Sequence, residues 1–420
     1  MRRRRLSLAS TPRHTPLVSR RAALVLLTLS ACRAATQADV PPVAYTGALP
    51  ATVPARFLSN VLSVEAQIDG ASARALLVDT GSAMTGVDPS SYAGVGIPGD
   101  ASSFASLAVG SLTWKKVPSV ALGECGATCG PYDATGVIGG NVLRSFVVSF
   151  DYRAPAVVFG ASQPPSTVSA TPVVIPFSVE GGGMGTIAGG NGEEVDVPPT
   201  RLVLHATIEG AARTFVVDTG ASYSLLRETL FDALVGDGRT TLALQSATTS
   251  GTAQGSVART HALGVGAATS SGSPVESVAD SVVDDLASET GASIDGLLGG
   301  SFLRAYVAVV DYGAGALSLY AYTASDPLAD EFDRVGFFLA PNASAYVIAQ
   351  IVPGSAAAGV AGLEGATLVD VDGTALEGLD PETADRLLRG AVGATHAMHV
   401  QGGAGVVAET LPVEDVLALP

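Results

Sequence analysis

Short apolar runs alternate with polar positions along most of the chain, and Gly, Pro, Asp or Ser bounds most of the runs. Residues 62–68 (LSVEAQI) and 202–208 (LVLHATI) are typical, because an apolar side chain recurs at every second position. This period of two predicts strands that bury one face. After residue 330 the pattern changes, and Pro381 to Leu388 has the spacing of a helix, with Asp380 as its candidate N-cap. We therefore expect a mainly β protein with a small C-terminal unit of mixed class.

The same succession of segments occurs twice. Residues 62–87 (LSVEAQIDGASARALLVDTGSAMTGV) correspond to residues 202–226 (LVLHATIEGAARTFVVDTGASYSLL), and residues 135–152 (TGVIGGNVLRSFVVSFDY) correspond to residues 295–312 (DGLLGGSFLRAYVAVVDY). In both halves an alternating strand, a Gly turn, an apolar strand ending in Asp-Thr-Gly and an apolar-Gly-Gly turn follow one another. A duplicated domain is the economical explanation, so we expect two homologous β-lobes.

Composition marks the boundaries between these units. The connection at about residues 161–200 is rich in Gly and Pro and is expected to be a flexible linker around one strand, from Val173 to Val179. A second, acidic boundary lies at residues 323–332. We expect a signal peptide at residues 1–31, a linker at 32–57, a first lobe at 58–165, a second lobe at 166–322 and a C-terminal domain at 330–420.

Composition and charge exclude two classes of protein. Apolar residues make up 47% of the chain and charged residues 15%, which argues against global disorder. The formal net charge is −16, although seven of the 23 Lys and Arg residues lie before residue 22. A surface this acidic repels the phosphate backbone of nucleic acids, so we expect no nucleic-acid partner.

The N-terminus resembles an export signal. Residues 1–21 are basic, and residues 22–31 (AALVLLTLSA) form an apolar run too short to span a bilayer of about 30 Å as a helix. The run ends in Leu-Ser-Ala followed by Cys32, which resembles the lipobox of bacterial lipoproteins, whose Cys carries lipid. The resemblance implies an exported protein anchored through Cys32 in the cell envelope, on the periplasmic face or at the outer membrane. An ordinary signal peptide with an incidental Cys is the alternative.

The two other cysteines, Cys125 and Cys129, stand four residues apart in a Gly-rich stretch. In an oxidising compartment a small-loop disulfide is the expected state of such a pair. A zinc site would need further ligands nearby, and the sequence offers none, so we expect no metal. His396 and His399 stand alone in an apolar stretch and are interpreted as strand residues.

Two Asp-Thr-Gly triplets, at residues 79–81 and 218–220, carry the chemical signal. Each ends an apolar strand, residues 76–78 and 215–217, so the approach to each Asp is buried. The Gly permits a sharp turn that leaves the carboxylate at the tip of a loop. A pseudo-twofold axis between the halves brings the two tips together, and two carboxylates at hydrogen-bond distance share one proton. The ionised partner can then act as general base on a water molecule while the protonated partner polarises a carbonyl group.

These motifs resemble those of the retropepsin/pepsin superfamily of aspartic peptidases, over roughly residues 60–322. Members carry Asp-Thr/Ser-Gly in each half and a later apolar-Gly turn, which residues 137–143 (VIGGNVL) and 297–303 (LLGGSFL) match. The resemblance implies that Asp79 and Asp218 form a catalytic dyad. It also implies supporting roles: Thr80 and Thr219 brace the two loops across the interface, Gly81 and Gly220 supply backbone groups to the carboxylates, Ser82 hydrogen-bonds the outer carboxylate oxygen, and Ala221 stands where retroviral-type members also have Ala. An inert copy retained for its fold is the alternative.

The second half contains an insertion where members of this superfamily close a flap over the substrate. Asp218 precedes Gly266 of LGVG by 48 residues, whereas Asp79 precedes Gly110 of LAVG by only 31. The inserted stretch reads as a hairpin. We therefore expect a single flap, from the second lobe; an ordinary surface hairpin is the alternative. We expect Gly251 and Gly255 to make the tip of this hairpin mobile, and Ser250 and Thr252 to supply its polar contacts.

The C-terminal unit resembles a PDZ domain. Residues 351–357 (IVPGSAA) and 368–373 (LVDVDG) match a strand, a helix start and a strand ending in Asp-Gly, although Ala366 replaces the usual Asp. The resemblance implies that Val335, Gly336 and Phe337 form a loop whose N–H groups grip a peptide C-terminus. The resemblance also implies that the helix from Pro381 lines the groove in which the peptide binds. A structural module that packs on the lobes is the alternative.

The sequence thus predicts two retropepsin-like β-lobes plus a small PDZ-like α/β domain, and an aspartic endopeptidase without cofactor or metal. The expected partners are peptide or protein substrates, polypeptide tails at the PDZ-like groove, and a membrane through Cys32. A lipid-anchored peptide-binding protein with an inert cleft is the second hypothesis. A purely structural envelope lipoprotein is the third.

Overall fold

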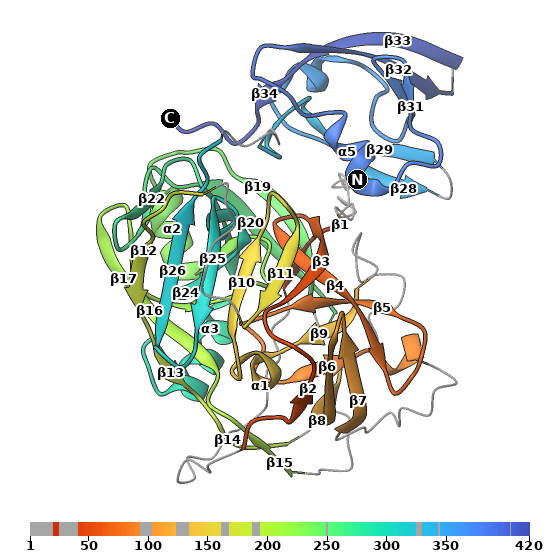
Figure 1. Ribbon diagram of the computed structural model, residues 1–420. Helices are drawn as coiled ribbons and strands as arrows, with labels where there is room; N and C mark the ends of the chain where they lie inside the picture. The colour runs from red at the N-terminus through yellow and green to blue at the C-terminus, as the bar shows by residue number, and fades with distance from the viewer. Residues whose placement is uncertain are drawn as a thin grey trace, which may run out of the picture.

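The computed structural model describes residues 20–24, 41–92, 103–122, 134–160, 168–186, 194–248, 251–324, 330–342, 345–403 and 405–420. Cys32, Cys125, Cys129 and Ser250 lie outside these residues, so lipidation, the disulfide and the role of Ser250 stay predictions. The described chain forms two β-lobes and a C-terminal domain (Figure 1). Among its helices, none combines the length and apolar character that a membrane span requires.

Lobe 1 is built from short strands, as the period-two pattern predicts. Its elements are β2 (Tyr45–Thr46), β3 (Ala51–Leu58), β4 (Val61–Ile68), β5 (Arg74–Val78), β6 (Thr85–Val87), a 3₁₀ helix (Pro89–Tyr92), β7 (Ser103–Val109), β8 (Leu112–Ala121), β9 (Ala134–Ile138), α1 (Gly140–Leu143), β10 (Val147–Asp151) and β11 (Ala156–Phe159). β5 runs parallel to β9 and β6 runs antiparallel to it, so the segment between β5 and β6 is held at the end of three paired strands.

Lobe 2 repeats this frame with additions. Its elements are β12 (Val173–Pro176), β13 (Ser178–Glu180), β14 (Gly183–Thr186), β15 (Glu194–Val197), β16 (Arg201–Ile208), β17 (Ala211–Val217), β18 (Ser224–Arg227), α2 (Glu228–Val235), β19 (Leu242–Thr248), β20 (Gly251–Arg259), β21 (Leu263–Val265), β22 (Ala268–Ser270), β23 (Pro274–Val278), α3 (Asp280–Thr290), β24 (Gly296–Leu298), α4 (Gly300–Leu303), β25 (Tyr306–Asp311) and β26 (Ala316–Ala321). β17 is parallel to β24 and β18 antiparallel to it, as for β5, β9 and β6 in lobe 1. A short strand β1 (Arg20–Leu24) pairs in parallel with β19.

The two lobes share one sheet. β10 pairs with β25 in antiparallel register, from Val147 opposite Asp311 to Phe150 opposite Ala308. β11 and β3 continue this sheet into lobe 1, and β26 and β12 continue it into lobe 2. Apolar side chains of both lobes form one continuous core over it, including Phe150 and Phe302. The lobes are therefore fixed to one another through backbone hydrogen bonds as well as through apolar burial.

The boundaries differ from the expected ones in two places. β2 and β3 lie in the segment expected as a linker at residues 32–57, because the alternating burial of β3 extends lobe 1 toward the N-terminus. In the connection at residues 161–200, the expected strand from Val173 to Val179 is divided into β12, which joins the shared sheet, and β13, which pairs with β16. The connection also holds β14 and β15, which pair with each other and were not expected because their sequences are rich in Gly and acidic residues.

In the described residues, the C-terminal domain holds a six-stranded sheet, a two-stranded sheet and one α-helix. Its elements are β27 (Asp333–Arg334), β28 (Phe337–Asn342), β29 (Ala345–Ile351), a 3₁₀ helix (Ala356–Gly359), β30 (Thr367–Val371), β31 (Thr374–Ala375), α5 (Pro381–Arg386), β32 (Thr395–Gly402), β33 (Gly405–Pro412) and β34 (Glu414–Asp415). The predicted helix and cap are confirmed, because the Asp380 carboxylate accepts the N–H of Thr383 at 3.0 Å. His396 and His399 lie in β32, as expected.

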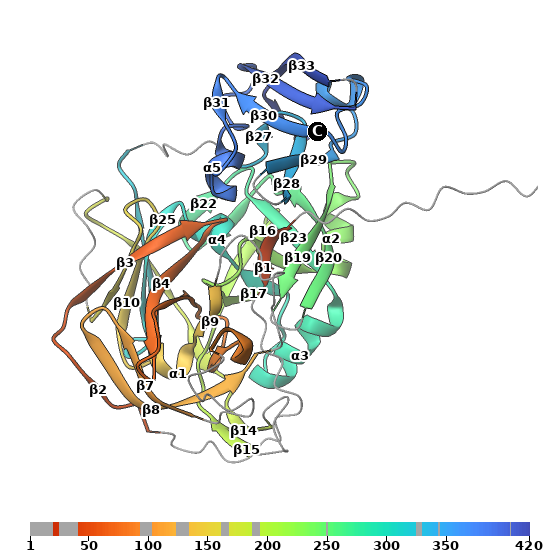
Figure 2. The ribbon, with the colours of Figure 1, turned by 90° about the vertical axis from the view of Figure 1, so that its right-hand side faces the viewer.

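The C-terminal domain docks on lobe 2 through an apolar cluster. Phe332, Phe338 and Val416 pack with Tyr223 and Val257 of lobe 2 in one buried group, and the rings of Tyr223 and Phe332 lie 6.0 Å apart. In both ribbon views α5 and β28 lie on the side of the domain that faces the lobes (Figures 1 and 2).

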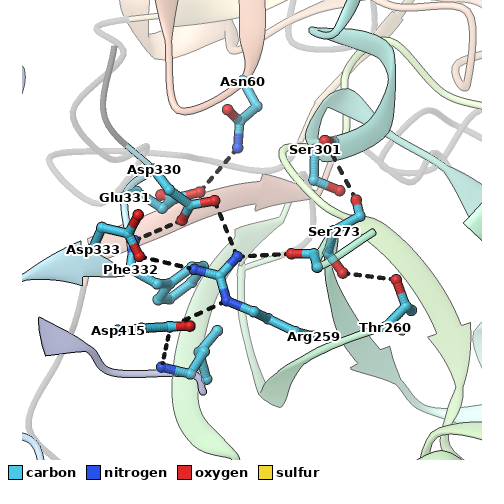
Figure 3. Close-up of polar contacts among 12 residues, drawn as sticks. Asn60, Arg259, Thr260, Ser273, Ser301, Asp330, Glu331, Phe332, Asp333 and Asp415 are labelled. Carbon is cyan, nitrogen blue, oxygen red and sulfur yellow. Dashed lines mark hydrogen bonds and ion pairs between the residues drawn. The ribbon is translucent and has the colours of Figure 1, made fainter. Parts of the chain in front are cut away.

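A single arginine adds an ionic contact to this interface. Arg259 ends β20 and is 6% exposed. Its guanidinium contacts Asp330 at 3.0 Å, Asp333 at 3.4 Å and Asp415 at 3.2 Å, and donates to the carbonyl of Gly272 at 2.7 Å (Figure 3). The hairpin of lobe 2 is thus tied at its base to the chain that enters and leaves the C-terminal domain.

Candidate active site

Two equivalent loops meet between the lobes. Asp79 follows β5 and Asp218 follows β17, and both side chains are buried. The amide of Asp79 donates to the carbonyl of Ile138 at 3.0 Å, and the amide of Asp218 donates to that of Leu298 at 3.0 Å. The parallel partner strand therefore fixes the position at which each Asp leaves its sheet.

Each carboxylate is oriented by the backbone of its own loop. Oδ1 of Asp79 accepts the N–H groups of Gly81 at 2.7 Å and Ser82 at 3.1 Å. Oδ1 of Asp218 accepts those of Gly220 and Ala221 at 2.9 and 3.0 Å. The second oxygen of each carboxylate, Oδ2, is buried and accepts no donor from the described residues. One oxygen of each carboxyl group thus accepts two backbone hydrogen bonds, and the other has no hydrogen-bond partner among the described residues.

The structure differs here from the predicted role of the Ser82 hydroxyl. That hydroxyl donates to the carbonyl of Met84 at 2.8 Å. The contact between Ser82 and the carboxylate of Asp79 is made by the Ser82 amide instead. Ala221 makes the same amide contact in lobe 2, which needs no side-chain hydroxyl. In both loops backbone amides therefore orient Oδ1, and the hydroxyl contact that the resemblance implies for Ser82 does not occur among the described residues.

The threonines brace the two loops across the interface. The Thr80 hydroxyl accepts the amide of Thr219 at 3.1 Å and donates to the carbonyl of Val217 at 2.8 Å. The Thr219 hydroxyl accepts the amide of Thr80 at 3.1 Å and donates to the carbonyl of Val78 at 2.7 Å. These four reciprocal bonds tie the two loops together across the interface, which is the arrangement that the resemblance implies for Thr80 and Thr219.

The glycines of the triplets are required for space. A Cβ on Gly81 would lie 2.2 Å from Cγ of Asp218, and one on Gly220 would lie 2.4 Å from Cγ of Asp79. Neither glycine has a positive φ, so the reason differs from the predicted sharp turn. Each carboxyl group packs directly on the loop of the opposite lobe, which brings Asp79 and Asp218 together.

The glycine turns that follow later brace the same site. A Cβ on Gly140 would lie 2.4 Å from Cβ of Thr200 in lobe 2, and one on Gly300 would lie 1.9 Å from the carbonyl oxygen of Asn60 in lobe 1. Gly140 therefore receives the side chain of Thr200, and Gly300 receives the backbone of Asn60, at distances that only Gly allows. Asn141 adds a brace that sequence reasoning missed, because its Oδ1 accepts both the amide and the hydroxyl of Thr85 at 2.8 and 2.9 Å.

Burial dominates the electrostatics of the pair. It raises the pKa of Asp79 well above its ordinary value, and the charge of the neighbouring Asp218 raises that pKa further. Burial also raises the pKa of Asp218, while the neighbouring carboxyl group of Asp79 and the amide of Gly220 oppose the rise. The arrangement favours one proton shared by two carboxyl groups.

The lobe 2 insertion forms the expected hairpin from β19 and β20, which pair from Leu242 opposite Val257 to Thr248 opposite Gly251. Gly255 lies within β20 and not at the tip; a Cβ there would meet Oε1 of Glu276 at 2.8 Å, so Gly255 serves close packing. Gly251 and Thr252 begin β20 beside the tip. In lobe 1, the described residues hold no hairpin between β6 and β7, where residues 93–102 are outside the description. Whether the hairpin covers the carboxyl pair stays a prediction.

The loop expected to grip a peptide tail is compact. Val335 and Phe337 are buried; the Val335 amide donates to the carbonyl of Leu388 at 3.0 Å, and the Phe337 amide donates to that of Val335 at 2.6 Å. The carbonyl of Gly336 accepts the hydroxyl of Ser355 at 3.2 Å. Two of the three expected donors thus already have partners, and tail binding stays a prediction.

The chain was compared with protein-family models and with solved structures, and both comparisons give matches. Residues 204–302 match the model of a family described as aspartyl protease. The second lobe is thus similar to aspartyl proteases. The matched segment contains Asp218 and the Gly-Gly turn at residue 299, so the resemblance drawn from these motifs is supported for this lobe.

The structure is similar to that of an aspartic proteinase from Irpex lacteus, with 16% sequence identity and a TM-score of 0.39 over 67% of this chain and 98% of that chain. A likeness this distant says nothing about activity. A search of curated proteins found no match.

Proposed function

We propose that the chain is an aspartic endopeptidase in which Asp79 and Asp218 activate one water molecule. The observation that carries the proposal is the crossed packing of the two loops, in which each carboxyl group rests against the Gly of the other lobe. That geometry has no structural purpose for two isolated acids, because burying two carboxyl groups side by side raises their pKa values and costs stability.

The mechanism follows from the open oxygens. The two Oδ2 atoms lack donors among the described residues, so they are the atoms that share a proton and hold the water. The ionised carboxylate accepts a proton from the water as it attacks the peptide carbon. The protonated carboxyl group donates its hydrogen bond to the peptide oxygen, where negative charge develops. The Gly and Ala amides keep Oδ1 of each group fixed throughout.

The β19–β20 hairpin serves as the flap. It is the long hairpin that lobe 2 adds to the shared frame, and its outer strand β19 accepts a further strand, β1, in parallel. An edge that accepts a strand is suited to binding an extended substrate by backbone hydrogen bonds. Closure over the cleft then excludes water other than the reacting one.

The C-terminal domain is a PDZ-like module that presents polypeptide tails to the lobes. β28 is an edge strand of its sheet, and β28 and α5 lie on the side of the domain that faces the lobes. These positions support the proposal that a peptide bound at this edge lies beside the catalytic unit. The signal at residues 1–31 exports the chain, and lipid on Cys32 anchors it in the envelope.

Hydrolysis of an unfolded protein such as casein tests the proposal. The purified chain is expected to cleave casein between mildly acidic and neutral pH, and pepstatin is expected to inhibit it. Asp79→Asn is expected to remove the activity while circular dichroism shows an intact fold. Cleavage that survives this substitution, or a wild-type chain inactive at every pH, would overturn the proposal and favour the inert peptide-binding protein.

A further inference from the structure

A buried cation lies opposite one of the two acids. β16 and β17 pair with Val203 opposite Val216, and the same register continued by two residues puts Arg201 opposite Asp218. Residues directly opposite in an antiparallel pair project to the same face of the sheet. Arg201 is fully buried, so its guanidinium stays inside the protein, and its charge interacts with the carboxyl groups of Asp79 and Asp218.

Lobe 1 has no such cation at the corresponding place. β4 and β5 pair with Ser63 opposite Leu77, and the register continued by two residues puts Val61 opposite Asp79. Val61 is 1% exposed and part of the apolar core. The duplication therefore reproduces the acid in both lobes and the cation in one.

Arg201 is held in place by an acid from a helix that lobe 1 lacks among its described residues. Its Nε donates to Oε1 of Glu289 at 3.1 Å and its Nη2 to Oε2 at 2.9 Å, a bidentate pair in which the Glu289 side chain is 8% exposed. Glu289 belongs to α3. A guanidinium held at two points cannot turn away, so its charge acts at a constant place.

The groups that face the carboxyl pair are few. Arg201 comes from β16, with Glu289 of α3 behind it, and the charge of Arg201 lowers the pKa of both Asp79 and Asp218 against the effect of burial. Tyr152 and Tyr312 follow β10 and β25, and burial raises the pKa of each, so both stay uncharged. Arg201 is therefore the one fixed positive charge that acts on the pair from these described elements.

We propose that Arg201, clamped by Glu289, is a positioning residue that keeps the Asp79–Asp218 pair in its singly protonated form at the working pH. This inference rests on the proposed function. Without the cation, burial would favour two protonated acids, and no base would be left to activate water. Because Arg201 and Glu289 both belong to lobe 2, residues of that lobe alone determine how many protons the two acids carry.

Three variants of the full chain test this role through pH profiles of kcat/KM on a peptide substrate. In Arg201→Met both limbs of the profile are expected to move to higher pH, because loss of a positive charge raises the pKa of nearby acids. Arg201→Lys is expected to restore most of the profile. Glu289→Gln leaves the charge of Arg201 uncompensated, so its limbs are expected to move to lower pH.

Arg334→Met is the matched control. Arg334 is also fully buried and pairs with a buried acid, Asp385, at 2.9 Å in the C-terminal domain. Its loss removes a similar ion pair far from the dyad, so stability is expected to fall while the pH profile stays in place. A role of Arg201 in folding alone predicts the same result for Arg201→Met.

Carbon-13 NMR titration of the two Asp carboxyl groups, assigned with the Asn variants, gives the same information without turnover. Titration midpoints that are equal in wild type, Arg201→Met and Glu289→Gln would overturn the inference, whatever the activity. Midpoints that shift in opposite directions in a chain without activity would support the inference on charge and reject the proposed peptidase. If Arg201→Met does not fold, Glu289→Gln alone decides, and an unchanged midpoint there overturns the inference.

Discussion

Lobes 1 and 2 share a frame and differ in what is attached to it. In both, a strand ends in Asp-Thr-Gly, a parallel strand accepts the Asp amide, and a Gly-Gly turn packs closely against a residue of the other lobe. Among the described residues, the long hairpin and the buried Arg201 occur in lobe 2 only, and the apolar cluster that docks the C-terminal domain belongs to lobe 2. The comparison suggests a division of labour: the shared frame brings the two acids together, and we propose that lobe 2 supplies the flap and the charge that acts on them.

The largest effect should follow from breaking the crossed packing, and it should be equal in both lobes. In Gly81→Ala and Gly220→Ala the new Cβ would lie 2.2 and 2.4 Å from the opposite carboxyl carbon, so the pair cannot keep its geometry. We expect kcat/KM on a peptide to fall about 10³-fold or more, since a misplaced acid–base pair loses most of its contribution.

Gly359→Ala is the matched control, because a Cβ at Gly359 meets nothing within 4 Å. Full activity of either loop variant would show that the two carboxyl groups do not pack as described. A loss of activity in only one of the two variants would show that the two lobes do not contribute equally to the site.

Removing a bracing hydroxyl should cost stability equally from either side. Thr80→Val and Thr219→Val each delete one hydroxyl that accepts an amide and donates to a carbonyl across the interface. Because two buried backbone groups lose a partner, we expect about 1–3 kcal/mol of destabilisation from each, measured by urea unfolding. Unequal losses of stability in the two variants would show that one loop depends more strongly on these bonds than the other does.

Much of this frame could be predicted from the sequence, because it depends on local patterns that occur twice. The paired triplets predicted the two loops, and the resemblance that they carry implied that Thr80 and Thr219 brace these loops. Arg201 was missed, since a lone Arg before an alternating run carries no signal until the register places it opposite Asp218. Gly255 was assigned to a tip because spacing cannot tell a turn glycine from one that permits close packing.

Shortening the lobe 2 hairpin should lower activity and leave the dyad intact. Replacing residues 246–253 by Asn-Gly keeps Leu242 to Gln245 paired with β20 and removes the outer part of the hairpin. We expect kcat/KM to fall on the order of 10- to 100-fold, or about 1.4–2.7 kcal/mol, with stability little changed.

The control shortens the β32–β33 hairpin of the C-terminal domain by the same length, replacing residues 400–407 and joining His399 to Ala408, which are paired. This control is expected to leave cleavage of a short peptide unchanged. An outer hairpin of lobe 2 that can be removed without effect is a surface feature and not a flap.

The smallest effect on activity is expected at the ionic contact between lobe 2 and the C-terminal domain. Arg259→Met removes the cation shared by Asp330, Asp333 and Asp415, so docking of the C-terminal domain should weaken while peptide cleavage is unchanged. Burial, followed by the charge of Asp330, raises the pKa of Asp333 to about 6. A raised acid pKa favours the protonated folded form, so its contribution to docking is present below about pH 4 and is lost as the pH rises through 6.

Limited proteolysis between pH 4 and 7 measures this docking. Release of the C-terminal domain should increase with pH, and more steeply in Arg259→Met. Release that is independent of both pH and the substitution would show that the apolar cluster around Phe332 holds the domain without help from the ions.

The central claim, that both lobes contribute to one catalytic unit, is tested most directly by the activities of Asp79→Asn, Asp218→Asn and the double variant on one peptide substrate at one pH. Two groups that share a proton and a water act together, so the loss in each single variant should equal the loss in the double variant. Losses that multiply, or a single variant that keeps substantial activity, would contradict the account.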